Sequence, residues 1–358
     1  MNTLKKLPLQ IAPILLMLLS TLLFTSCNTI IKGLTKNYTD PYHKKIAHSG
    51  FTEKTIQIGE TTLAYTEGPD NGPPLLLLHA QMTDWFDYSR VLPKLSKSYH
   101  IFVVDYNGHG KTISPISFMN ANAIGNILAT FIEQQIKEPV FVSGNSSGGL
   151  LAVWLAANRP QLVKAVLLED PPLFSAEYPR VKQTIAYKSF ISCHAYIESG
   201  SKEDFISYWI KANAGYIEKK AGKKAMPRLL LMIKTYREAN PGKPIELRLL
   251  PRMLRMIFRG MSQFDPHFGD AFYAGEWNKD FDHAQALAKI QCPVLLLQAN
   301  FEIRSDGILD GAMDENDVKK AMSLLKRGTY KKINAQHVVH LDKPVGFVRV
   351  LEGFLKGK

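Results

Sequence analysis

The pentapeptide at residues 144–148, Gly-Asn-Ser-Ser-Gly, constrains the fold of this chain more than any other feature. An apolar stretch typical of a buried strand precedes it at residues 139–143, and a helical pattern follows it at residues 150–157. A turn that joins strand to helix so tightly exposes the side chain at its tip and needs glycine where the two elements crowd together. The sequence therefore predicts a strand–turn–helix unit that presents Ser146 as a candidate nucleophile.

The rest of the chain alternates apolar strands with helical segments. Residues 55–58 and 61–66 alternate in polarity and predict a hairpin. Strands buried on both faces are predicted at residues 75–78, 101–105, 140–142, 165–168 and 294–297, and a further strand at 329–333. Helical patterns such as residues 121–137 separate them. This alternation predicts an α/β fold with a mostly parallel sheet covered on both faces.

One long segment interrupts the alternation. Residues 173–279 carry helical patterns broken by Pro and Gly, for example at Pro241-Gly242 and Pro251. We expect them to form a helical cap inserted into a core made of residues 51–172 and 280–358.

The N-terminus has the order of a secretory signal: Lys5 and Lys6, an apolar run over residues 11–24, then Thr25-Ser26-Cys27. An ending on cysteine resembles a bacterial lipoprotein signal, in which Cys27 is lipidated. This predicts a signal peptide at residues 1–26 and a flexible tether at 27–50. The alternative is an uncleaved anchor helix. Both place the protein at the cell envelope outside the cytoplasm, and the lipoprotein reading anchors it to a bacterial membrane by lipid.

The composition and charge of the chain limit which cofactors and partners are predicted. Cys193 and Cys292 form no disulfide framework or metal motif, and no glycine-rich phosphate loop is present, so neither a metal nor a nucleotide cofactor is predicted. The net charge of +12 is concentrated between Lys219 and Arg259, where twelve Lys or Arg accompany two acids. Without interleaved aromatics in an exported protein, this pattern does not indicate nucleic acid.

The basic segment has two interpretations. It is a solvated face, or it is attracted to an anionic membrane or an acidic substrate. On the second interpretation, Arg252, Arg255 and Arg259 would align on one helical face and rest on the membrane.

A serine nucleophile needs a base, an acid that orients the base, and donors for the oxyanion. His337, in a loop after the last predicted strand, is the candidate base. Glu302, in the loop after residues 294–297, is the candidate acid and keeps the chain order serine, acid, histidine. The oxyanion donors would be the N–H groups of Ser147, directly after the nucleophile, and Gln81, in the loop after residues 75–78.

Together, His79-Ala80-Gln81, the Asp-Tyr-Asn-Gly-His-Gly of residues 105–110, the turn at Ser146 and His337 resemble the α/β-hydrolase superfamily over roughly residues 55–355. The resemblance implies an eight-stranded, mostly parallel sheet, an inserted cap and a Ser–acid–His triad that works without a cofactor.

The chain departs from the superfamily pattern at two places. Ala80 stands where the oxyanion loop usually has glycine, and Glu302 where the acid is usually Asp. Some members of the superfamily place the acid at the end of the preceding strand, which makes Asp170 the alternative acid.

The expected function is hydrolysis of a small carboxylic ester with an apolar acyl or alcohol part, through an acyl-enzyme on Ser146. One alternative is hydrolysis of an amide, or of a carbon–carbon bond beside a ketone, by the same residues. Another is a non-catalytic binding lipoprotein of the same fold. The sequence makes no prediction of the oligomeric state.

Overall fold

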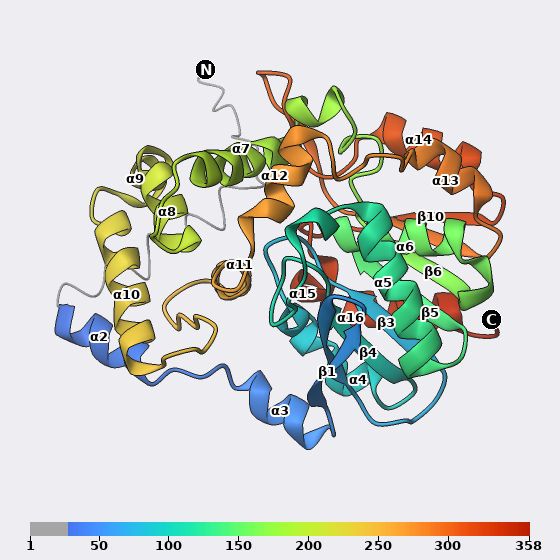
Figure 1. Cartoon of the computed structure of the whole chain (residues 1–358), viewed down its shortest axis with the longest axis horizontal. Helices are drawn as coiled ribbons and strands as arrows, with labels where there is room; N and C mark the ends of the chain where they lie inside the picture. Colours follow the sequence, from blue (N-terminus) through green and yellow to red (C-terminus); the bar gives the residue numbers. More distant parts are fainter. Residues whose placement is uncertain (1–27) are drawn as a thin grey trace, which may run out of the picture. The chain divides into compact units, whose positions relative to one another are not determined.

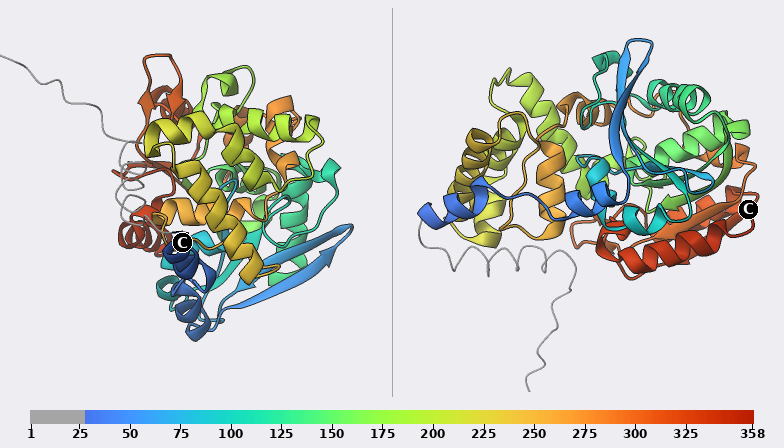
Figure 2. Two further views of the ribbon diagram at one scale, coloured as in Figure 1. Left: turned by 90° about the vertical axis from the view of Figure 1, so that its left-hand side faces the viewer. Right: turned by 90° about the horizontal axis from the view of Figure 1, so that it is seen from below.

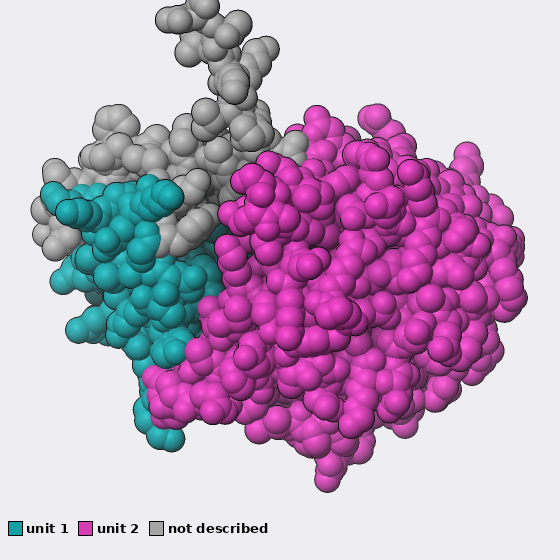
Figure 3. Space-filling view, turned by 90° about the horizontal axis from the view of Figure 1, so that it is seen from above, with its two compact units in different colours: residues 1–40, 202–262 teal, residues 41–201, 263–358 magenta. Residues whose placement is uncertain are grey.

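The computed structural model describes residues 28–358, so the predicted signal peptide and Cys27 lie outside the described residues. The described chain forms two compact units, coloured separately in Figure 3. One contains residues 28–40 and 202–262, and the other contains residues 41–201 and 263–358. Over residues 28–358, no helix is both long and apolar enough to cross a membrane.

The larger unit is built around a sheet of eight strands. These are β1 (Thr52–Ile58), β2 (Thr61–Glu67), β3 (Pro74–Leu78), β4 (His100–Asp105), β5 (Val140–Asn145), β6 (Val163–Glu169), β7 (Val294–Gln298) and β10 (Gly328–Lys332). A separate short hairpin is formed by β8 (Glu302–Ile303) and β9 (Leu309–Asp310).

The larger unit also contains a set of helices. They are α3 (Tyr42–His48), α4 (Leu92–Leu95), α5 (Ala121–Phe131), α6 (Ser147–Asn158), α7 (Ile185–Glu198), α12 (Pro266–Ala274), α13 (His283–Lys289), α14 (Glu315–Leu324), α15 (Val339–Asp342) and α16 (Pro344–Leu355). Shorter helical turns are η1 (Trp85–Arg90), η2 (Ile116–Phe118), η3 (Ile132–Ile136), η4 (Pro160–Leu162) and η5 (Arg180–Gln183).

The strands lie in the order β1-β2-β4-β3-β5-β6-β7-β10, and β2 alone is antiparallel to both of its neighbours. From β4 to β10 all pairs are parallel. Every residue of β3 and β5 is buried, because helices cover both faces; Figure 2 shows α6 and α16 on opposite sides of the sheet. The predicted α/β fold with an eight-stranded, mostly parallel sheet is confirmed.

The predicted insertion at residues 173–279 is helical, but it is divided between the two units. Helices α7 and α12 belong with the sheet, as Figure 1 shows for α12 beside α7. Aromatic packing explains this: Phe190 stacks on Phe272 with ring centroids 4.9 Å apart, and Phe268 packs against Tyr106 of the core at 5.7 Å. The smaller unit takes α8 (Phe205–Ala212), α9 (Ala214–Ala221), α10 (Ala225–Ala239) and α11 (Arg252–Met261).

The prediction of a flexible tether at residues 27–50 is corrected, because two helices occupy most of residues 28–50. Helix α2 (Asn28–Lys36) belongs to the smaller unit and fully buries Ile31. In α3, Ile46 is buried and His43 stacks on Phe86 with centroids 4.1 Å apart. The polar composition concealed apolar residues at helical spacing, and their burial stabilises ordered helices.

The prediction that Arg252, Arg255 and Arg259 rest on a membrane is also corrected. Arg259 is 5% exposed and forms an ion pair with Glu246 at 2.8 Å. Arg252 and Arg255 lie 3.8 and 3.4 Å from Asp40, a residue that is 2% exposed. These side chains hold the smaller unit together by ion pairing, and so they do not form a solvent-facing basic surface.

Candidate active site

Ser146 occupies the tip of the turn between β5 and α6, as predicted. Its backbone has φ 55° and ψ −122°, in a region that non-glycine residues rarely adopt. Its N–H donates to the carbonyl of Glu169 at 3.0 Å, which holds this conformation against the end of β6. A Cβ at Gly144 would lie 2.2 Å from the carbonyl oxygen of Gly148, and one at Gly148 would lie 2.3 Å from that of Leu78. Both glycines are therefore required sterically.

The histidine and its acid are joined directly. His337 Nδ1 lies 2.7 Å from Asp170 Oδ2. The other Asp170 oxygen accepts the N–H of Ala299 at 3.0 Å, and the Asp170 N–H donates to Leu297 at 2.7 Å. Asp170 is 2% exposed and has φ 47°, a conformation that Asp tolerates better than most residues. These contacts fix the carboxylate so that it faces the imidazole.

The structure does not bring Glu302 to His337; the carboxylate hydrogen-bonded to His337 is that of Asp170, the predicted alternative acid. Glu302 is exposed on the β8–β9 hairpin, where it is paired in register with Asp310. Asp170 directly follows β6, which lies next to β5 in the sheet, so its side chain emerges beside the end of the strand that carries Ser146. The loop after β7 contributes the N–H of Ala299 to Asp170 and no carboxylate to His337.

Asp170 also sets the charge preference of His337. Burial works to lower the pKa of the His337 imidazole, but the hydrogen bond and charge of Asp170, aided by Glu169, raise it above the usual value. The side chain is 40% exposed, which limits the opposing effect of burial. With Asp170 holding Nδ1, the Nε2 atom is the one left for proton exchange.

Asn145 connects the serine turn to the histidine loop. Its side-chain amide donates to the carbonyl of Glu169 at 2.9 Å and to the carbonyl of His337 at 3.0 Å. The residue before Ser146 thus contacts both the strand end that carries Asp170 and the backbone of His337. Asp170 and the His337 loop thus lie at the carboxyl ends of β5 and β6, next to the turn that carries Ser146.

The two predicted oxyanion donors are Gln81 and Ser147. Among residues 28–358, neither backbone N–H has a hydrogen-bond acceptor. By contrast, the N–H of the next residue, Met82, donates a hydrogen bond to His109 Nε2 at 3.2 Å. Tyr106 joins the two donor segments, because its hydroxyl donates to the carbonyl of His79 at 3.0 Å and lies 2.8 Å from Ser147 Oγ. Tyr106 thereby connects the segment that leads to Gln81 with the residue that follows Ser146.

Sequence reasoning missed a set of buried charged residues beneath this site. Glu169, Asp87 and His340 are all 0% exposed, and His340 Nδ1 lies 2.8 Å from Glu169 Oε2. The available signal was the acid pair Glu169-Asp170 at the end of an apolar strand, since a carboxylate in a doubly covered strand needs a partner.

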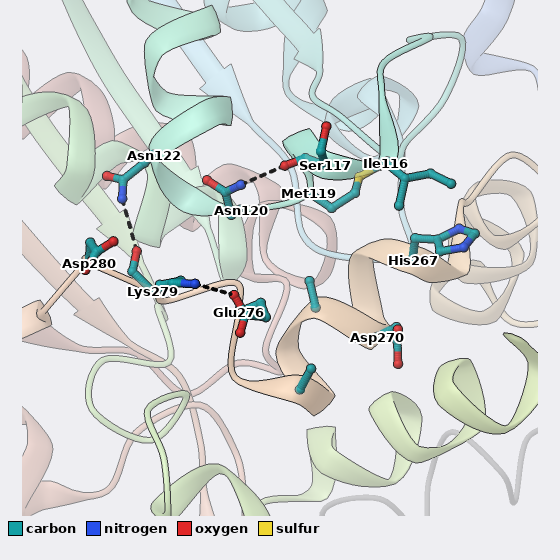
Figure 4. Close-up of a pocket in the computed structure, with 12 residues that line it drawn as sticks. Ile116, Ser117, Met119, Asn120, Asn122, His267, Asp270, Glu276, Lys279 and Asp280 are labelled. Atoms are coloured by element: carbon teal, nitrogen blue, oxygen red, sulfur yellow. Dashed lines mark hydrogen bonds and ion pairs between the residues drawn. The ribbon is translucent and has the colours of Figure 1, made fainter. Parts of the chain in front are cut away.

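A hollow of about 550 Å³ lies elsewhere on the larger unit, between η2 with the start of α5 and helix α12 (Figure 4). Its charged groups pair locally: Lys279 with Glu276 at 3.3 Å, and Asp270 with His194 at 2.9 Å. It contains none of the residues around Ser146. The described part of the chain also has no group of three or more His, Cys, Asp or Glu placed to hold a metal.

A family model described as the alpha/beta hydrolase fold matches residues 73–191, the part that carries the oxyanion loop and the serine turn. The chain has the α/β-hydrolase fold. Among solved structures, an enol-lactonase from Burkholderia xenovorans LB400 aligns with TM-score 0.58 at 16% identity, over 84% of this chain and 99% of that one. A membrane phospholipase A aligns with TM-score 0.54 at 19% identity, over 96% of both chains. At these identities the likeness establishes the fold alone.

The curated relatives of low identity include hydrolases. Serine hydrolase-like protein 2 of Homo sapiens is 21% identical over 81% of this chain and 88% of its own length. Lipase 3 of Moraxella sp. (strain TA144) is 29% identical over 45% of this chain, and the match spans 53% of the lipase. These similarities support assigning the chain as a hydrolase.

Proposed function

We propose that this α/β hydrolase is a serine esterase that cleaves small carboxylic esters through an acyl-enzyme on Ser146. The observation that carries the proposal is the 2.7 Å bond between His337 Nδ1 and Asp170, placed beside the strained turn at Ser146. A binding protein gains nothing from a buried carboxylate that orients a histidine near a strained serine turn.

In the proposed reaction, Ser146 Oγ attacks the ester carbonyl carbon while His337 Nε2 takes the hydroxyl proton. Asp170 keeps the imidazole in the required tautomer and stabilises the imidazolium. The N–H groups of Gln81 and Ser147 bind the oxyanion. Collapse of this intermediate breaks the bond to the alcohol, which leaves with the proton from His337. Water then attacks the acyl-enzyme by the same route, releasing the carboxylic acid and restoring Ser146.

An apolar acyl or alcohol part is proposed for the substrate. An aromatic cluster lies beside the segment that carries Gln81: Phe268 of α12 packs against His109, whose Nε2 accepts the N–H of Met82. Phe268 also contacts Phe272, which stacks on Phe190 of α7. The partial match to a lipase is consistent with such a substrate.

A fluorophosphonate probe tests the proposal directly. We expect the wild-type protein to take up one adduct, located by mass spectrometry on the peptide that contains Ser146. With p-nitrophenyl butyrate, a burst of p-nitrophenol equal to the enzyme concentration should precede steady turnover if deacylation is the slower step. A correctly folded protein that neither labels nor hydrolyses any ester would instead support a non-catalytic binding role.

We further propose that the protein is lipid-anchored through Cys27 to a bacterial membrane, outside the cytoplasm. The support is the order of charged, apolar and small residues before Cys27. In full-length protein expressed in a bacterium, Cys27→Ser should abolish incorporation of labelled palmitate. Cys292→Ser is the matched control and should leave it unchanged. Palmitate that persists in Cys27→Ser would favour another anchor or an ordinary signal peptide.

A further inference from the structure

A buried ion cluster lies directly beneath the proposed catalytic residues. His340 Nδ1 lies 2.9 and 2.8 Å from the two carboxylate oxygens of Glu169. On the other side of the ring, His340 Nε2 lies 3.3 Å from Asp87 Oδ1, an ion pair whose angle is poor for a hydrogen bond. All three side chains are 0% exposed.

The arrangement requires a cationic ring. A histidine with a carboxylate at each nitrogen satisfies both only when both nitrogens carry protons. Burial opposes the charge, but Glu169 and Asp87 outweigh it and raise the pKa of His340 to about 9. The Tyr88 ring stacks on one face of His340 with centroids 3.8 Å apart, and this contact favours a cationic imidazole.

One end of the cluster holds the acid and the base. Glu169 immediately precedes Asp170, and its carbonyl accepts the N–H of Ser146 at 3.0 Å. Its carboxylate also accepts the backbone N–H of His340 at 2.8 Å, which fixes the chain three positions after His337. The Glu169–His340 pair therefore joins the end of β6 to the histidine loop.

The other end holds the oxyanion loop. Thr83 Oγ1 lies 2.7 Å from Asp87 Oδ2 and 2.8 Å from the carbonyl of Ala80. Its single proton goes to the carboxylate, which is the stronger acceptor. The Tyr88 hydroxyl donates to the carbonyl of Leu78 at 3.1 Å. The two η1 residues that touch His340 are thus linked to the chain on either side of Gln81, Tyr88 through Leu78 before it and Asp87 through Thr83 after it.

We propose that His340 is a positioning residue: its ring, clamped between Glu169 and Asp87, locks the Asp170–His337 pair to the loop that carries the Gln81 oxyanion donor. The inference rests on the proposed esterase activity and extends it. Proton transfer and oxyanion binding occur in one transition state, so the two groups must keep a fixed separation.

His340→Gln tests this, with kcat expressed per site titrated by the fluorophosphonate probe so that unfolded protein does not count. We expect kcat per titrated site to fall about 100-fold, with KM changed by no more than about twofold, because the loss is of transition-state geometry. His283→Gln is the matched control. His283 is also 0% exposed and hydrogen-bonded in the same unit, but its partners are Phe174 and Asn278.

Thr83→Val provides a second variant of nearly the same shape. It removes the hydroxyl that joins Asp87 to the oxyanion loop, together with that hydroxyl's contacts to the Ala80 carbonyl and His79 Nδ1. It should lower kcat per titrated site by about tenfold, comparable to one charge-assisted hydrogen bond. If both variants keep the wild-type kcat per titrated site while their melting temperatures fall, the cluster is only structural and the inference is overturned. Wild-type protein without esterase activity would instead refute the proposed function.

Protein stability gives an independent readout. The titratable groups facing His340 are Glu169 from β6, Asp87 and Tyr88 from η1, His79 from the loop after β3, and His337 from its own loop. Because folding raises the pKa of His340, its stabilising contribution is complete below about pH 6.5 and is lost as pH rises through about 9. The urea midpoint of wild type should therefore fall more than that of His340→Gln between these pH values. Parallel curves would contradict a charged His340.

Discussion

Ser146→Ala is expected to lower kcat for p-nitrophenyl butyrate by about a millionfold, the scale found when a triad nucleophile is removed. The reason is that no acyl-enzyme can form without Oγ. The fold should survive, because backbone hydrogen bonds hold the positive-φ turn: the Ser146 N–H donates to the Glu169 carbonyl, and the Ser146 carbonyl accepts the Gly149 N–H. Alanine retains both. Steady-state kinetics and fluorophosphonate labelling measure the loss, and circular dichroism checks the fold.

Ser143→Ala is the matched control for this prediction. Ser143 lies on β5, the strand that leads into the turn at Ser146. It is fully buried, and its hydroxyl has no hydrogen-bond partner among residues 28–358. Removing a buried, unpaired hydroxyl costs little, so kcat should stay within about twofold of wild type. Ester turnover that survives in Ser146→Ala would place the nucleophile elsewhere and overturn the proposed function.

The features predicted correctly from the sequence are those encoded locally. The five strands buried on both faces appear at their predicted positions because each apolar run is complete within a few residues. The turn at Ser146 is local in part: a Cβ at Gly144 would meet Gly148, whereas Gly148 is required by the approach of Leu78 from β3. His337 follows from its position after the last strand.

The features missed depend on how distant segments meet. Asp170 rather than Glu302 reaches His337 because β6 lies next to β5 and the segment after β7 turns away into a hairpin. The arginines of α11 pair with Asp40 and Glu246, and Asp40 lies more than 200 positions away in the chain. A basic helical face and a buried ionic one have the same sequence pattern until the partner acids are placed.

Asp170→Asn is expected to lower kcat by about 10⁴, because an amide can stabilise the wrong tautomer of His337 and cannot balance the imidazolium charge. Asn adopts positive φ about as readily as Asp, so the backbone at φ 47° should be retained. Glu302→Gln is the matched carboxylate-to-amide control on the exposed hairpin and should change kcat by no more than about twofold.

The same pair of variants separates a tautomer effect from general damage through the pH dependence of kcat/KM. Asp170 raises the pKa of His337, and the base acts only when it is neutral. Wild-type activity should therefore be lost on the acid side at a pH above the ordinary histidine value. In Asp170→Asn the raising charge is gone, so the residual activity should persist to lower pH, whereas Glu302→Gln should keep the wild-type profile. If Glu302→Gln instead loses more activity than Asp170→Asn, the acid of the working enzyme is Glu302, and the contact between His337 and Asp170 has only a structural role.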